Sequence, residues 1–233
     1  MTVAEMGSLF DILQDKPDSL YFSSEEKTAL LNSAQNDFVN DVIGDFFFPN
    51  GRSQASPRVS SAIEATSTQS RILRPLMFFD LAVTSDASGY ITDAVINSAL
   101  QARSGDTKNH MFVTALALST GVPVKWTPHN DWYALMDNSF TAATTTNPRY
   151  VEESGRILVN PTGVVNYLIS VIKEPTEMLL DEATPANNIE SELPTAAHEH
   201  IVSIALNKAG IASREQVLLL LSQQKDTNKM FLA

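Results

Sequence analysis

Apolar residues in this chain recur at helical spacing near both ends and at strand-like spacing between them. From Ser23 to Gly44 they are three and four positions apart, which predicts an amphipathic helix of about five turns. Ser23 and Glu26 have the capping-box spacing that starts a helix, and Gly44 favours the left-handed conformation that ends one. A short helix and a loop broken at Pro17 are expected before this segment.

The middle of the chain contains runs rich in aromatic and β-branched residues, which are typical of strands. The clearest runs are residues 74–83, 121–126, 156–160 and 164–172. Residues 150–151 are expected to form a hairpin with the third run, around Glu152–Gly155. Residues 110–118 are apolar throughout, so spacing alone leaves strand and helix open. Residues 91–102 are ambiguous, with a short helix as one interpretation, and residues 129–136 predict a helical turn or short helix.

The end of the chain returns to helical spacing after an acidic connector at residues 178–192. Pro194 occupies a first-turn position, and apolar residues then recur from Thr195 to Ala209, before Gly210. A second capping-box spacing, Ser213 with Gln216, predicts a last helix through Leu221.

These elements predict an α+β fold. An amphipathic N-terminal helix and two C-terminal helices are expected to pack with a mostly antiparallel β central subdomain. We expect a single structural unit over residues 1–233, with a helical part at 1–50, a mainly β part at 70–175 and a helical pair at 193–223. The polar stretch Val59–Ser70 is interpreted as a weak helix or an extended arm.

The charge balance argues against one class of function, although modest acidity is also explained by solubility alone. Sixteen Lys and Arg face 27 Asp and Glu, a formal net charge of −11, and no three basic residues are consecutive. A protein that grips nucleic acid needs a basic face to displace counterions from the phosphates, so such a grip is not expected. No apolar run approaches the length of a membrane span, and no secretory signal is recognised. The absence of cysteine excludes disulfides and thiolate metal sites.

The chain offers little sequence evidence for catalysis. His198 and His200 would lie about 200° apart on a helix, so they cannot share a metal ion. No phosphate-binding glycine loop, dinucleotide fingerprint or nucleophile elbow occurs. The acidic pairs Glu152–Glu153 and Asp181–Glu182 fall in expected loops, where solvated charge is the usual explanation. We therefore assign no catalytic, cofactor-binding or metal-binding residue; carboxylates brought together from distant segments stay an open alternative.

The order of several sequence blocks resembles a known layout. The blocks are Leu31–Val39, Trp132–Phe140, Asn147–Tyr150, Arg156–Asn160, Lys173–Pro175 and Leu193–Val202. In this order they resemble the ring-forming neck proteins of crAss-like and related tailed bacteriophages.

This resemblance implies a non-enzymatic virion protein without cofactor, metal or membrane contact. Copies would form a closed ring, twelvefold to match a portal, in the neck between head and tail, after assembly in the host cytoplasm. The portal and adjacent neck or tail proteins would be its partners, and genomic DNA would pass through the lumen without sequence-specific binding. A closed ring needs two different complementary patches on each copy. The aromatic candidates for these patches, each with core packing as its alternative, are Phe46, Phe47, Phe48, Trp132, Phe140 and Tyr150.

Two other functions stay open at this stage. One is a different virion component, such as a minor capsid, stopper or tail-tube protein. The other, from a different class, is a hydrolase or small-ligand protein with a pocket between the β part and the terminal helices.

Overall fold

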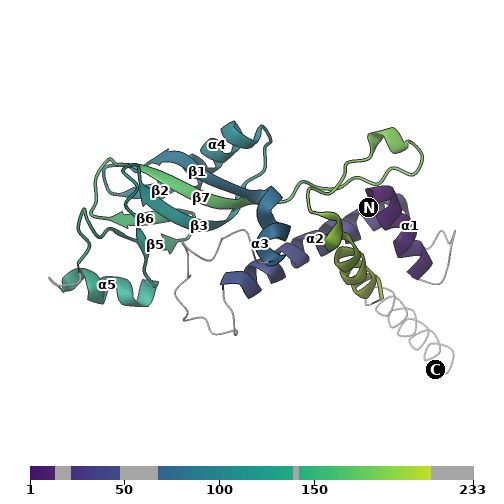
Figure 1. The fold of residues 1–233 in the computed structure, drawn as a ribbon, viewed down its shortest axis with the longest axis horizontal. Helices are drawn as coiled ribbons and strands as arrows, with labels where there is room; N and C mark the ends of the chain where they lie inside the picture. The colour runs from purple at the N-terminus through teal and green to yellow at the C-terminus, as the bar shows by residue number, and fades with distance from the viewer. Residues whose placement is uncertain (14–21, 48–67, 139–141, 211–233) are drawn as a thin grey trace, which may run out of the picture. The chain divides into compact units, whose positions relative to one another are not determined.

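A computed structural model describes residues 1–13, 22–47, 68–138 and 142–210, and its ribbon is drawn in Figure 1. The chain is organised as two compact units. Unit 1 combines Met1–Asn40 with the segment from Glu177 onward, and unit 2 is Asp41–Thr176. The α+β class is confirmed. One structural unit was expected, and the chain instead divides into two, because residues 1–40 group with the segment from Glu177 onward. The predicted last helix lies outside the described residues, as does most of Val59–Ser70.

Unit 1 is built from helices and a structured connector. Its described elements are α1 (Val3–Leu13), the first part of α2 (Ser24–Phe47), the short η2 (Pro185–Asn187) and a helix at residues 195–210. The predicted capping box of α2 is confirmed. The Ser23 amide donates to Glu26 Oε2 at 2.8 Å, and the Glu26 amide donates back to Ser23 Oγ at 3.2 Å. Helix α2 continues past Gly44 to Phe47, three residues beyond its predicted end.

The apolar stripe predicted for α2 is buried. Leu31, Ala34 and Val39 are fully shielded from solvent, because helical spacing brings them to one side of the helix. Phe38 on the same stripe stacks on His200, with the ring centres 6.0 Å apart. This burial is the main stabilising contribution available to a helix whose sequence is otherwise polar.

The described residues of unit 2 form two sheets together with helices. The first sheet has the order β1-β7-β3 and is antiparallel throughout: β1 (Met77–Thr84), β7 (Asn166–Lys173), β3 (His110–Leu118). The second has the order β2-β6-β5-β4: β2 (Tyr90–Thr92), β6 (Arg156–Asn160), β5 (Arg149–Glu153), β4 (Lys125–Trp126). Among the described strands only the short β4–β5 pairing is parallel, so the predicted antiparallel character is correct for the other pairs.

The structure resolves the segments that spacing left open. Residues 110–118 form β3, which pairs along β7, so backbone pairing rather than periodicity decides their conformation. Residues 91–102 divide into the end of β2 and helix α4 (Asp93–Ser104), which Gly105 ends in the left-handed conformation. The expected short helix is α5 (His129–Asp137). The predicted strand from Arg74 begins later, since α3 (Thr68–Leu73) and the 3-10 turn η1 (Arg74–Leu76) precede β1.

Both sheets and α4 contribute side chains to one hydrophobic core in unit 2. Tyr150 of β5 and Tyr167 of β7 are its largest members, each 2% exposed. Ile96 and Leu100 of α4 enter the same core one helical turn apart. Burial raises the pKa of the Tyr150 hydroxyl far above its ordinary value, with the nearby Glu152 carboxylate adding to the shift, so the ring stays neutral.

One buried ion pair ties β7 to the loop after α4. Lys173 is 2% exposed, and its ammonium donates to the Asp106 carboxylate. Asp106 also accepts from the Lys108 amide and from Ser104 Oγ, both at 3.0 Å. Burial alone would raise the pKa of Asp106, but these hydrogen bonds and the Lys173 charge outweigh it and lower the pKa below its usual value.

Replacing Lys173→Met keeps the aliphatic volume and removes the charge, so we expect the free energy of unfolding to fall by about 2 kcal/mol at pH 7. Because the folded-state pKa of Asp106 is lowered, its stabilisation is present above the unfolded pKa and is lost as the pH falls through the folded pKa. Urea unfolding should therefore show the two proteins converging below about pH 4. The exposed Lys125→Met is the control and should have little effect; a Lys173 deficit that is the same at every pH contradicts the pairing.

Candidate functional site

The predicted aromatic interface residues divide into three groups. Trp132 on α5 and Tyr150 on β5 are 5% and 2% exposed, so they are core residues, and their assignment to an interface is corrected. Phe46 and Phe47 fall in the last turn of α2. Phe48 and Phe140 lie outside the described residues. Core packing, the alternative for each candidate, therefore holds for Trp132 and Tyr150. The same aromatic residue types occur in cores and at interfaces, so only their burial distinguishes the two roles.

The histidines are used structurally. His198 is buried rather than on the surface, and its Nε2 lies 2.9 Å from the Leu193 carbonyl just before its own helix. His200 is exposed on another side of that helix, as the spacing predicted. His110 Nδ1 lies 2.6 Å from Asn97 Oδ1, and its Nε2 lies 3.6 Å from Asp93. Burial lowers the pKa of His110 despite the nearby Asp93 and Glu174.

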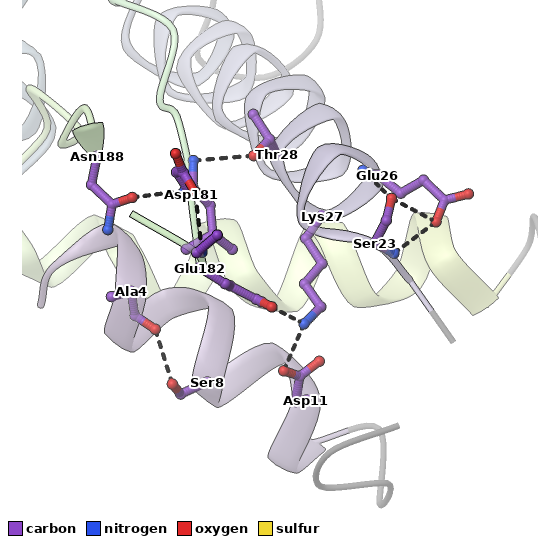
Figure 2. Close-up of polar contacts among 12 residues, drawn as sticks. Ala4, Ser8, Asp11, Ser23, Glu26, Lys27, Thr28, Asp181, Glu182 and Asn188 are labelled. Atoms are coloured by element: carbon purple, nitrogen blue, oxygen red, sulfur yellow. Dashed lines mark hydrogen bonds and ion pairs between the residues drawn. The ribbon is translucent and has the colours of Figure 1, made fainter. Parts of the chain in front are cut away.

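Unit 1 contains a pocket of about 690 Å³ that sequence reasoning missed. Residues of α1, the beginning of α2 and the connector around Leu180–Asn188 line it. Figure 2 shows the polar side chains from these three segments pointing toward one another. The pocket lies within the size range of small-ligand sites.

Lys27 is a buried cation in the lining of this pocket and binds two carboxylates. It is 4% exposed, and its ammonium donates to Asp11 Oδ2 at 2.8 Å and to Glu182 Oε1 at 2.9 Å (Figure 2). The carboxylates come from α1 and from the connector, so one cation joins three segments. Burial alone would lower the pKa of Lys27, but the hydrogen bonds and charges of Asp11 and Glu182 outweigh it and raise the pKa.

One sequence signal could have located this buried cation. Lys27 lies four positions before Leu31, on the apolar stripe of the predicted helix. A cation on a buried stripe needs an anionic partner, because an unpaired buried charge is strongly destabilising. The sequence contains 27 carboxylates, so it could not say which two would serve.

The connector is held rigidly around the pocket. Asn32 of α2 binds both backbone groups of Met178, donating to its carbonyl at 2.9 Å and accepting from its amide at 2.7 Å. The Leu180 amide donates to Thr28 Oγ1 at 3.1 Å. The Asp181 amide donates to Asn188 Oδ1 at 2.7 Å. These bonds fix the backbone that leads to Glu182.

The Asp181 side chain closes the tip of the connector. Its carboxylate accepts hydrogen bonds from the Asn187 side chain at 3.0 Å and from the Thr184 and Ala183 amides at 2.8 and 3.0 Å. The Asn187 and Thr184 bonds together lower the pKa of Asp181, so the group is ionised at neutral pH.

The outer face of the connector presents two apolar side chains. Leu179 and Ile189 face each other across an antiparallel bridge, with amide–carbonyl distances of 3.1 and 3.0 Å. They are 40% and 44% exposed, and directly opposed residues share one face. Leu180, the next residue, points to the other face, where it is buried and lines the pocket.

Ser8 and Ser23 of the pocket are hydrogen-bonded within their own helical turns. Ser8 Oγ donates to the Ala4 carbonyl at 3.0 Å, and Ser23 Oγ lies 3.2 Å from Glu26 within the capping box. A serine nucleophile requires a neighbouring base oriented by a third group, and neither hydroxyl has that arrangement. Within the described part of the chain, no three His, Asp or Glu side chains are placed to hold a metal ion. No described helix is long and apolar enough to cross a membrane.

Comparison with known proteins leaves the function open. No protein-family model matches the chain, and no curated protein is significantly similar to it. No residue role is therefore transferred from a relative.

Replacing Lys27→Met should lower the free energy of unfolding of unit 1 by about 3 kcal/mol, because Asp11 and Glu182 would face each other without a cation. Hydrogen exchange of the α1 amides gives the readout. Since the pKa of Lys27 is raised on folding, its stabilisation is fully present below the unfolded pKa and is lost as the pH rises through the folded pKa.

The control for this prediction is Lys208→Met in the same unit. Lys208 pairs with Asp37 at 2.6 Å near the surface, so its loss should cost under about 1 kcal/mol. Equal effects of the two substitutions would contradict a central role for Lys27.

Proposed function

We propose that this protein is a non-enzymatic structural component of a tailed-bacteriophage virion that assembles as a closed ring in the neck. The ring joins the portal to the tail and lets genomic DNA pass, after assembly in the host cytoplasm. The observation that carries the proposal is the order of sequence blocks from Leu31–Val39 to Leu193–Val202, which resembles neck ring proteins. Twelve copies would match a portal.

The distribution of charge supports passage of DNA without capture. Unit 1 has 15 acidic and 6 basic residues, a net charge of −9, whereas unit 2 has 12 and 10, a net charge of −2. Most of the total of −11 therefore belongs to unit 1. A strongly acidic surface repels phosphates at short range, so DNA can move past it without forming counterion-releasing contacts.

The connector supports the proposal with a surface suited to protein contact. Leu179 and Ile189 are apolar, exposed and adjacent, and hydrogen bonds to α2 already hold their backbone in place. A contact made by a fixed backbone loses little conformational entropy on binding. We assign this apolar pair, in place of Trp132 and Tyr150, to one of the two patches that a closed ring requires.

The mass of the purified protein in solution tests the proposal. A ring of twelve chains of 25.5 kDa has a mass of about 306 kDa, and light scattering after size-exclusion chromatography should give one species near this value. Native mass spectrometry then gives the copy number. A monomer that stays monomeric at high concentration, with purified portal present, contradicts the ring.

The double substitution Leu179→Ser with Ile189→Ser tests the assigned patch. Because both side chains are exposed, unfolding stability should change by less than about 1 kcal/mol while the large species is lost. Val164→Ser, at a 69% exposed apolar position of unit 2, is the matched control and should leave the mass unchanged. An intact ring in the double variant removes the connector from the interface.

A further inference from the structure

Among the described residues that line the pocket of unit 1, the carboxylates outnumber the cations. Asp11, Asp181 and Glu182 line it together with Lys27, which leaves a net charge of −2 among these four groups. The Lys27 ammonium already forms ion pairs with two of these carboxylates, Asp11 and Glu182. The charge of these four groups favours a ligand that is a cation or presents one.

Two carboxylate oxygens are left available to such a ligand. Asp11 uses Oδ2 and Glu182 uses Oε1 to bind Lys27. No donor among the described residues reaches Asp11 Oδ1 or Glu182 Oε2. The two side chains are 23% and 53% exposed, so both remain accessible while Lys27 holds them in place.

The third feature is an aromatic wall. Phe22 lines the pocket, and an edge-to-face contact with the buried Phe10, at 5.9 Å between ring centres, orients its ring. A planar cation can stack on an aromatic ring while its N–H groups reach carboxylates at the edge. A guanidinium has five such donors in one plane, whereas an ammonium is a compact point charge.

We propose that this pocket binds the guanidinium group of an arginine side chain presented by another protein. The two free carboxylate oxygens would accept its N–H donors, and Phe22 would contact its flat face. The volume of about 690 Å³ leaves room for the whole side chain and part of its backbone. The proposal goes beyond ring formation and does not depend on it, because a single copy contains the complete pocket.

Isothermal titration calorimetry of the full chain tests the proposal with three capped pentapeptides. They are acetyl-Gly-Gly-Arg-Gly-Gly-amide and its counterparts with lysine or citrulline in the central position. Citrulline has nearly the same shape as arginine and no charge. We expect saturable binding of the arginine peptide, at least about fivefold weaker binding of the lysine peptide, and no binding of the citrulline peptide at about 10 mM.

Glu182→Gln locates the binding. It removes one charge from the pocket but leaves Asp11 to hold Lys27, so arginine binding should weaken about fivefold or more. Glu25→Gln, an exposed change of equal charge in the same unit and outside the pocket lining, is the control and should bind like the unchanged protein. Circular dichroism checks that both variants are folded.

Three outcomes would overturn the proposal: no saturable binding of the arginine peptide, equal binding of the citrulline peptide, or equal affinity of Glu182→Gln and Glu25→Gln. These outcomes are independent of the mass measurement. A ring that does not bind arginine refutes this pocket alone, and a monomer that binds arginine refutes the ring alone.

Discussion

The organisation of unit 1 depends on one buried cation. Lys27 lies on the otherwise apolar stripe of α2, and only the carboxylates of Asp11 and Glu182 make its burial tolerable. Those partners come from α1 and from the connector, and Glu182 lies 155 residues after Lys27 along the chain. A single ammonium therefore joins α1 and α2 to a connector that lies far along the sequence. The same contact positions the walls of the pocket.

Unit 2 also contains a buried lysine that is paired with a carboxylate. Lys173 of β7 is buried and paired with Asp106, but the hydrophobic core shared by both sheets and α4 already joins the elements around it. In unit 1, hydrogen bonds of the Asn32 and Thr28 side chains join α2 to the connector, in addition to the burial of apolar residues. Hydrogen bonds of this kind contribute modestly to stability but fix geometry. The connector is consequently a rigid surface element rather than a loose linker.

This rigidity connects the structure to the proposed function. A subunit of a closed ring needs contact surfaces that are formed before assembly, since ordering them on binding reduces affinity. The connector meets that need with an apolar pair, Leu179 and Ile189, on one face and the acidic pocket on the other. The concentration of negative charge in unit 1 is compatible with cargo DNA passing freely and with basic groups of other proteins being bound.

Local interactions account for what the sequence alone determined: the capping box of Ser23 and Glu26, the buried stripe of α2, the β5–β6 hairpin and the α+β class. Each depends on residues a few positions apart, or on burial of one face of one element. Only the tertiary structure decided that residues 110–118 form a strand, that Trp132 and Tyr150 belong to the core and not to an interface, and that the chain forms two units. It alone also selected the partners of Lys27. These outcomes depend on contacts between segments that are distant in the sequence. The spacing of residues along the chain does not specify which of many chemically equivalent side chains will come into contact.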